Sequence, residues 1–516
     1  MNFFGNKTSG TTKKSTIRTV QVPVKASSNG AKPASGSASP GNGSRPSAAP
    51  ANRFQLSQRH GAPKVAKTIR QPSKTVERRA LASGRGVKRK SATPDVVFSD
   101  EEEDDSSDVG ASESDTSRKR VKSSVSSVES LGGPQRDIAS KKAFAKEGKP
   151  LRFLHGADAT SGEHARKFVV PWGGSNVHTV ELQYPSRSKK ERFELVWPKG
   201  DDYKPMEDLL ATIETISTYY LPDDLSAECL DDTDGFPRRL NRAWKKEDIQ
   251  EWVKIIEEFN EMLERLVDDG TIERELSKCR SMHIDWIKRI LEQIFWRTVS
   301  PKAEMLNQYK MGSDNVYGEL LPKFVTDIIK QTNLNREQTF IDLGSGVGNV
   351  VLQAALEVGC ESWGIEMMKN PCDLAELQAK EFSARSQLWG LNVGSVNLLR
   401  GDMTSHPDVP KLLQRADVVL VNNQAFTPEL NDKLLTMFLD LKPGAQVVSL
   451  KPFVPEGHKM AQRNVDSIVN QFVQRSLTYY SGYVSWSYGG NAHWYIATKD
   501  LRPLNAFRRK MGLDRL

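Results

Sequence analysis

The sequence predicts an α/β fold with a mostly parallel sheet, preceded by a helical part and a disordered N-terminal tail. After about residue 320, short apolar segments alternate with helical ones, which is typical of βαβ units and of a sheet covered on both faces. Residues 476–499 instead indicate an antiparallel hairpin with a Gly-Gly turn. Residues 1–150 have too few apolar side chains to bury a core. We therefore divide the chain into residues 1–150, 151–320 and 321–516.

The predicted tail separates its charges into blocks. Residues 64–90 are basic, residues 99–115 are acidic, and residues 118–122 are basic again. Blocks of like charge repel and usually act as interaction tails, and Lys and Arg side chains that neutralise phosphates release counterions. The tail therefore predicts a DNA-binding arm, and its short basic clusters fit a nuclear localisation signal. A tail that only solubilises the chain is the alternative, and the acidic block has no single predicted role.

The composition indicates which partners and which cellular compartment the protein is expected to have. The net charge of +8 and the isoelectric point of about 9.0 favour polyanionic partners. Cys229, Cys279, Cys360 and Cys372 show no CxxC or zinc-ligand spacing, which favours buried thiols in a reducing, intracellular compartment, and no metal site is predicted. No signal peptide and no run of the roughly 18 apolar residues that a membrane span needs is present, so we expect a soluble protein without a membrane partner.

Between residues 151 and 320 the sequence predicts a β-hairpin followed by helices. Segments 177–184 and 191–197 alternate apolar and polar residues and are joined by the polar PSRSKK, which indicates a hairpin. Segments 204–222, 246–270 and 282–300 have apolar residues at helical spacing and polar caps. The aromatic residues of this part, such as Trp252 and Trp286, are predicted to lie in its core.

The segments after residue 320 form the predicted sheet. Strands are expected at 339–345, 362–367, 395–403, 416–423 and 445–450, and helices at 370–390 and 428–441. In such a sheet the ligand lies beyond the carboxyl ends of the strands, near the point where strand order reverses. The loops after these strands therefore carry the candidate site.

The first of these loops is a glycine turn behind Asp342. The glycines at 344, 346 and 348 let the backbone turn sharply and approach a ligand closely. A dinucleotide fingerprint needs Gly or Ala where this chain has Asn349, and no Walker Gly-Lys-Ser/Thr follows. The turn therefore predicts a nucleoside site without a diphosphate cradle.

Acidic residues follow the next two strands. Glu366 is placed to accept hydrogen bonds from ribose hydroxyls. Asp402 would accept from an adenine amino group, with Met403 against the ring, although a helix N-cap is the alternative for Asp402. Together with Asp342 these acids favour a nucleoside cofactor that carries a positive charge, and S-adenosylmethionine is such a cofactor.

The fourth strand ends in VNNQAF, residues 421–426. Nucleic-acid amino methyltransferases often carry an Asp/Asn-Pro-Pro-aromatic tetrad at this place. Asn422 and Phe426 supply the amide and the aromatic ring, but both prolines are missing. The acceptor is therefore not predicted to be the amine of a base.

Several motifs, taken together and in order, resemble those of the Dot-one (disruptor of telomeric silencing) histone methyltransferases. They are VYGE at 316–319, DLGSGVGN at 342–349, GIE at 364–366, VNN at 421–423 and VSW at 484–486. The resemblance extends from about residue 151 to the end, and the basic tail is similar to that of the fungal form. It implies a class I S-adenosylmethionine-dependent methyltransferase with a Rossmann-like fold and no SET domain. The implied reaction is methylation of lysine 79 of histone H3 in nucleosomes, by a nuclear chromatin regulator with roles in telomeric silencing and the DNA damage response.

The resemblance also implies roles for individual residues. The loop that covers the cofactor would consist of Val316, Tyr317, Gly318, Glu319 and Leu320. The cofactor pocket would contain Phe340, Ile341, Asp342, Leu343, Gly344, Ser345, Gly346, Val347, Gly348, Asn349, Glu366, Asp402 and Met403. The catalytic lysine channel would be formed by Asn422, Phe426 and Trp486, with Trp494 a weaker candidate. Gln424 stands where relatives often have Phe.

Two other classes of function stay open. A nucleic-acid methyltransferase is favoured by the basic tail and disfavoured by VNNQAF, and a non-catalytic nucleosome-binding scaffold could have kept the same fold. The lysine methyltransferase needs a neutral amine, whereas free lysine has a pKa of about 10.4. An apolar aromatic channel disfavours the ammonium form, so we expect Asn422 to orient the amine and the proton to leave to water before attack.

Overall fold

The computed structural model describes residues 19–20, 136–146, 151–200, 202–307, 318–480, 482–486 and 492–513. All of them belong to one compact unit. The charged blocks of the tail, Val316, Tyr317 and the predicted Gly-Gly turn therefore lie outside the described residues.

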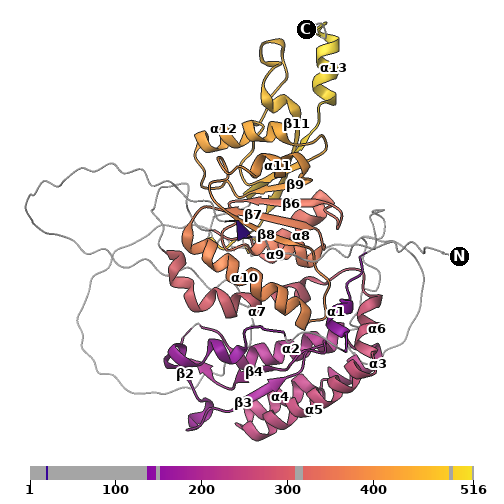
Figure 1. The fold of residues 1–516 in the computed structure, drawn as a ribbon, viewed down its shortest axis with the longest axis vertical. Helices are drawn as coiled ribbons and strands as arrows, with labels where there is room; N and C mark the ends of the chain where they lie inside the picture. The colour runs from indigo at the N-terminus through magenta and orange to yellow at the C-terminus, as the bar shows by residue number, and fades with distance from the viewer. Residues whose placement is uncertain are drawn as a thin grey trace, which may run out of the picture. The chain divides into compact units, whose positions relative to one another are not determined.

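The compact unit is built on an 8-stranded sheet with the order β1-β8-β7-β6-β9-β10-β12-β11 (Figure 1). Neighbours from β1 to β10 run parallel, and β12 pairs antiparallel with both β10 and β11. The strands are β1 (Thr19–Val20), β6 (Thr339–Leu343), β7 (Glu361–Glu366), β8 (Val396–Arg400), β9 (Val418–Val421), β10 (Gln446–Ser449), β11 (Phe472–Tyr479) and β12 (Ala492–Lys499). This confirms the predicted parallel sheet with an antiparallel end.

The connection between β11 and β12 is longer than predicted. Tyr479 pairs with Ala492 at the loop end of this hairpin, so residues 480–491 connect the two strands.

Helices cover both faces of the sheet. Phe340, Val418 and Ile496 pack on one side with helices α8 (Pro322–Thr332) and α9 (Asn349–Glu357). Ile341, Val419 and Ala497, each the next residue along its strand, pack on the other side with α11 (Val409–Arg415) and α12 (Pro428–Met437). Side chains alternate between the faces of a strand, which is why β6 and β9 are buried throughout. α10 (Lys369–Leu388) and α13 (Arg502–Lys510) follow β7 and β12, and the short 3-10 helices η5 (Phe438–Asp440), η6 (Gln462–Asn464) and η7 (Ile468–Gln471) lie in loops.

The part before the sheet contains the predicted hairpin and helices. β3 (Thr179–Leu182) and β4 (Glu191–Glu194) pair antiparallel, and α2 (Pro205–Tyr219), α5 (Ile249–Asp268) and α7 (Ile284–Thr298) match the predicted segments. The α5 helix begins where Asp248 accepts a hydrogen bond from the Glu251 N–H at 3.0 Å, as an N-cap does. The other elements are α1 (Lys141–Phe144), η1 (Gly156–Ala159), η2 (Gly162–Lys167), β2 (Phe168–Val169), η3 (Pro171–Gly173), β5 (Trp197–Pro198), α3 (Asp223–Cys229), α4 (Phe236–Lys245), α6 (Thr271–Lys278) and η4 (Ser300–Asn307). Trp252 and Trp286 are buried, as expected.

The folded part begins earlier than residue 151. Ile138 is fully buried and Phe144 is 7% exposed, both within the core of the helical part. The Arg136 guanidinium donates to the Glu357 carbonyl, and the Ser140 N–H donates to the Gly390 carbonyl at 2.9 Å. A boundary at 150 is therefore wrong for residues 136–146. Two apolar side chains are too weak a signal in a polar stretch, and their burial against residues far along the chain is what orders the segment.

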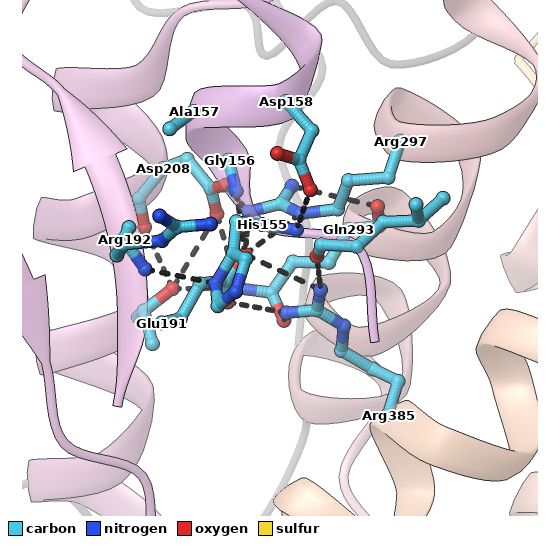
Figure 2. Close-up of polar contacts among 12 residues, drawn as sticks. His155, Gly156, Ala157, Asp158, Glu191, Arg192, Asp208, Gln293, Arg297 and Arg385 are labelled. Carbon is cyan, nitrogen blue, oxygen red and sulfur yellow. Dashed lines mark hydrogen bonds and ion pairs between the residues drawn. The ribbon is translucent and has the colours of Figure 1, made fainter. Parts of the chain in front are cut away.

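A buried charged cluster joins β4, α2 and α7 of the helical part to α10, which packs beside the sheet (Figure 2). Glu191 of β4 accepts hydrogen bonds from Arg297 of α7 and Arg385 of α10, and Arg297 also pairs with Asp208 of α2 at 2.6 Å. The Glu191, Arg297 and Arg385 side chains have no solvent exposure. Burial alone would raise the pKa of Glu191, but the two guanidinium groups hold it below its ordinary value. The helix α10 follows β7, the strand that ends in Glu366. The cluster therefore fixes the helical part to α10.

None of the described cysteines forms a disulfide; Cys229, Cys360 and Cys372 are buried, as predicted, whereas Cys279 is only half-buried. Within the described ranges, no helix combines the length and apolar character that spanning a bilayer requires.

Candidate functional site

The glycine turn lies at the carboxyl end of β6. Gly344, Gly346 and Gly348 have φ values of 90°, 54° and 87°, in the left-handed region that favours glycine. The N–H groups of Gly344 and Ser345 donate to the Ile365 carbonyl at 3.0 and 2.9 Å, which fixes the turn to the neighbouring β7. The backbone is therefore bare and rigid where a ligand approaches.

Glu366 at the end of β7 faces the same turn. One of its carboxylate oxygens accepts from the Gly346 N–H at 3.0 Å, and the other accepts from the N–H groups of Met367 and Met368 at 2.8 and 2.7 Å. Burial raises the pKa of Glu366, and these backbone donors oppose that shift. The contacts fix the direction in which the carboxylate is presented to the pocket.

Asp342 is the second acid of the pocket and is 4% exposed. Burial, together with the negative charge of Glu366, raises its pKa to about 7. The buried Asp342 and the half-buried Glu366 line one cavity and favour a ligand with positive charge, since a cation stabilises the ionised form of each.

A short segment before α8 closes one side of the pocket. Glu319 and Ser485 exchange hydrogen bonds, because the Glu319 N–H donates to the Ser485 hydroxyl and the Ser485 N–H donates to the Glu319 carbonyl, both at 2.9 Å. Leu320 forms an antiparallel bridge with Val484, and the Leu321 N–H donates to the Tyr483 carbonyl at 2.8 Å. The ends of the VYGE and VSW motifs, far apart in sequence, are thus paired.

The candidate lysine channel lies beside this pairing. The Asn422 amide nitrogen donates to the Gly318 carbonyl at 3.1 Å. A Cβ placed on Gly318 would lie 2.9 Å from the Trp486 ring, and one placed on Gly344 would lie 3.8 Å from the Phe426 ring. Asn422 and Phe426 line the same pocket as the glycine turn, whereas Trp486 lies against Gly318 and is not among the lining residues.

Most of the predicted cofactor residues that are described line a single pocket. The lining residues that the sequence predicted are Gly318, Glu319, Leu320, Asp342, Gly344, Ser345, Gly346, Val347, Asn349, Glu366, Met403, Asn422 and Phe426. The lining residues that the sequence did not single out are Val350, Ile365, Met367, Met368, Pro371, Gly401 and Leu420. Met367, Met368 and Pro371 directly follow Glu366, so their position after the acid was the signal that could have found them.

Several predicted pocket residues lie elsewhere. Phe340 packs with α8 and α9, whereas Ile341 and Leu343 pack with α11 and α12, because these apolar side chains fill the cores on the two faces of the sheet. Gly348 ends the turn as the N-cap of α9 and is not among the lining residues. The Asp402 carboxylate is exposed and accepts from the N–H and hydroxyl of Thr404 at 2.8 and 2.9 Å, so a local turn holds it.

The exposure of three further side chains shows whether they belong to the channel. Trp494 is 2% exposed and packs on Phe324 with ring centroids 5.4 Å apart, so it belongs to the core and not to the channel. Gln424 is exposed and does not line the pocket. Asn423 is fully buried and its amide oxygen accepts from the N–H groups of Leu450 and Lys451, which makes it a link between β9 and β10.

The fold and the site define the class of protein. Parallel strands with an antiparallel end, a glycine turn after β6 and an acid after β7 form the cofactor site of a class I S-adenosylmethionine-dependent methyltransferase. The chain is an enzyme of this class.

The comparisons identify the family within this class. A family model described as "Histone methylation protein DOT1" matches residues 295–499. A protein from Aspergillus fumigatus named "Histone-lysine N-methyltransferase, H3 lysine-79 specific" is 47% identical over 429 residues, which cover 82% of this chain and 83% of the relative. A protein of the same name from Emericella nidulans is 46% identical and covers 73% of this chain and 76% of the relative. The chain belongs to the DOT1 family of histone-lysine N-methyltransferases.

Proposed function

We propose that this chain transfers methyl groups from S-adenosylmethionine to lysine 79 of histone H3 in nucleosomes. The observation that carries the proposal is that Asn422 and Phe426 line the same pocket as the acids and the glycine turn, with Trp486 against the lining residue Gly318. A methyl donor in the pocket would then face an amine in the channel.

The residues of the pocket fit the cofactor. Glu366 would accept hydrogen bonds from the ribose, and the bare backbone at Gly344 and Gly346 leaves room for the ligand. The carboxylates of Asp342 and Glu366 complement a cationic ligand better than an anionic one. When bound, S-adenosylmethionine supplies an electrophilic methyl group on a sulfonium.

The channel residues would prepare the acceptor. Asn422 donates through its nitrogen to Gly318, so its carbonyl oxygen is directed to accept from the lysine amine. The half-buried rings of Phe426 and Trp486 would exclude water and disfavour the ammonium form of the substrate. The lysine proton would leave to water before attack, and the walls would align the nitrogen with the methyl carbon.

The partner is proposed to be the whole nucleosome in the nucleus. The basic blocks at 64–90 and 118–122 would contact DNA phosphates, and the shorter clusters within them would serve as nuclear localisation signals.

The test is mass spectrometry of histones after incubation of nucleosomes, or of naked DNA, with the protein and the cofactor. We expect methyl groups on lysine 79 of histone H3, no methylated base, and loss of cofactor binding and methylation in Gly346→Arg, whose side chain would fill the pocket. Methylation of DNA would support the nucleic-acid enzyme, and calorimetry that finds no cofactor binding by the unmodified protein would support the scaffold.

A further inference from the structure

Gln378 is a buried amide on the outer side of the cofactor turn, and nothing in its sequence position marks it as part of the site. It lies on α10 and is 1% exposed. Its side-chain nitrogen donates to the Val347 carbonyl at 2.7 Å and to the Asn349 side-chain oxygen at 3.0 Å. One buried amide group therefore holds both the backbone of the glycine turn and the first side chain of α9.

The chain of hydrogen bonds continues to the pocket wall. The Asn349 side-chain nitrogen donates to the Glu319 carboxylate at 2.9 Å, and both residues are 8% exposed. An amide has one donor end and one acceptor end. Because the Asn349 oxygen is taken by Gln378, its NH₂ group must face Glu319. The direction of donation thus runs from Gln378 through Asn349 to Glu319.

Glu319 is the pocket residue that this chain of hydrogen bonds reaches. It lines the pocket, and its backbone belongs to the short segment that is paired with Ser485. The backbone pairing fixes where the residue lies, whereas the Asn349 contact fixes where one carboxylate oxygen points. A reversed Asn349 amide would place its oxygen against that carboxylate, and two buried acceptors in contact are unfavourable.

We propose that Gln378 is a positioning residue of the cofactor site, which sets the polarity of the Asn349 amide and thereby holds the Glu319 carboxylate toward the cofactor. The proposal rests on the proposed function, since it assigns Gln378 to the binding of S-adenosylmethionine. Gln378 does not touch the pocket itself, and its effect is transmitted by Asn349.

The experiment measures the Kd of adenosylhomocysteine by calorimetry for the full chain, Gln378→Met, Glu319→Gln and the double variant. Methionine keeps the length of the side chain but cannot donate. Loss of an oriented buried hydrogen bond costs about 1.4 kcal/mol, which corresponds to a roughly tenfold weaker Kd. We expect that tenfold loss in the Gln378→Met single variant, and less than a twofold further loss when Glu319→Gln is already present.

A matched control separates positioning from general stability. Gln353 is also a buried glutamine, 2% exposed, and it donates to the Pro322 carbonyl at 2.8 Å and to Thr326, away from the pocket. Gln353→Met should lower the Tm as much as Gln378→Met does, yet leave the Kd unchanged. Gln378→Leu serves as the second variant if Gln378→Met is unfolded at the working temperature.

The outcomes distinguish the two proposals. If the unmodified chain binds adenosylhomocysteine and Gln378→Met weakens binding equally with and without Glu319→Gln, or no more than the Gln353 control does, the role of Gln378 is overturned. If the unmodified, folded chain does not bind the ligand at all, the proposed function fails first, and the role assigned to Gln378 falls with it.

Discussion

At the scale of single residues, Asp342 shows that a side chain of the cofactor site can lower the folding stability of the chain. Its carboxyl is buried beside Glu366, and its pKa is about 7 in the folded chain, compared with about 3.9 for an exposed aspartate. Between these two pH values the folded state holds a proton that the unfolded state has released. Folding stability therefore falls as the pH rises from about 4 to 7, and the full cost of the buried charge is present above pH 7.

Replacing Asp342 by Asn should consequently stabilise the free protein and weaken the site. At pH 8 we expect a higher Tm for Asp342→Asn, by roughly 2–4 °C for each kcal/mol gained, and at least a tenfold weaker Kd for S-adenosylmethionine. At pH 4 the Tm of the two proteins should agree. Calorimetric scans at both pH values, with binding measured at pH 8, provide the check, and an equal or lower Tm at pH 8 would contradict the argument.

Gly318 allows a close approach of the Trp486 ring. A methyl group at Gly318 would lie 2.9 Å from the ring, closer than real side chains come. We expect Gly318→Ala to displace Trp486 and to raise the KM for nucleosomes several-fold, with a smaller change in Tm. Gly200→Ala is the control, because nothing lies within 4 Å of its added Cβ. Equal kinetics of both variants would exclude Trp486 from the channel.

At the scale of elements, the charged cluster connects β4, α7 and α10. Glu191 accepts from two buried arginines of separate helices, whose charges it compensates, and from the neutral Gly156 N–H at 2.9 Å. Removing one member of a buried pair leaves an uncompensated charge in a medium that solvates it poorly. The cluster therefore couples the stability of the helical part to that of the part that contains the sheet.

Glu191→Gln should lower the free energy of unfolding by about 3–5 kcal/mol in urea titrations at pH 7. The control is Glu207→Gln at the exposed pair with Lys204, where the expected change is below about 1 kcal/mol. Because the pKa of Glu191 is held below its ordinary value, its contribution is present above about pH 4 and is lost as the pH falls further. The difference between Glu191→Gln and the unmodified protein should shrink in acid, and a difference that persists would contradict this assignment.

At the scale of the whole molecule, the catalytic unit and the basic blocks are proposed to have different tasks. The pocket determines the chemistry, whereas a run of Lys and Arg side chains contributes affinity for phosphates that does not depend on sequence. We expect deletion of residues 64–122 to weaken nucleosome binding and to flatten the dependence of log Kd on log salt. Binding assays at several salt concentrations test this, with cofactor affinity as the control that should stay unchanged. Unaltered nucleosome binding would refute a DNA-contacting role.

Much of the fold and of the pocket could be predicted, because the signals are local. The alternation of apolar strands and helices predicted β6 to β10, and the glycines that follow Asp342 predicted the turn. Glu366 was found because the end of the next strand is a place where such a sheet binds ligands. Periodicity and turn chemistry act over a few residues, so a single sequence suffices to read them.

Other features required the folded chain. Trp486 and Trp494 come from one aromatic stretch, and only packing on Phe324 places Trp494 in the core. The boundary at residue 150 missed Ile138 and Phe144, because their burial depends on core residues far along the chain. The sequence position of Gln378 indicates only a residue of a helix, and its hydrogen bond to the glycine turn is seen only in the folded chain.

The sequence by itself determined the order of the elements, the glycine turn and the acids at the strand ends, since neighbouring residues dictate these. The tertiary structure decided the pairing of Glu319 with Ser485, the buried contacts among Glu191, Arg297 and Arg385, and the support of Asn349 by Gln378. These contacts join residues that are distant in the chain, and they form because a polar group buried by packing must find its partner wherever the fold brings one.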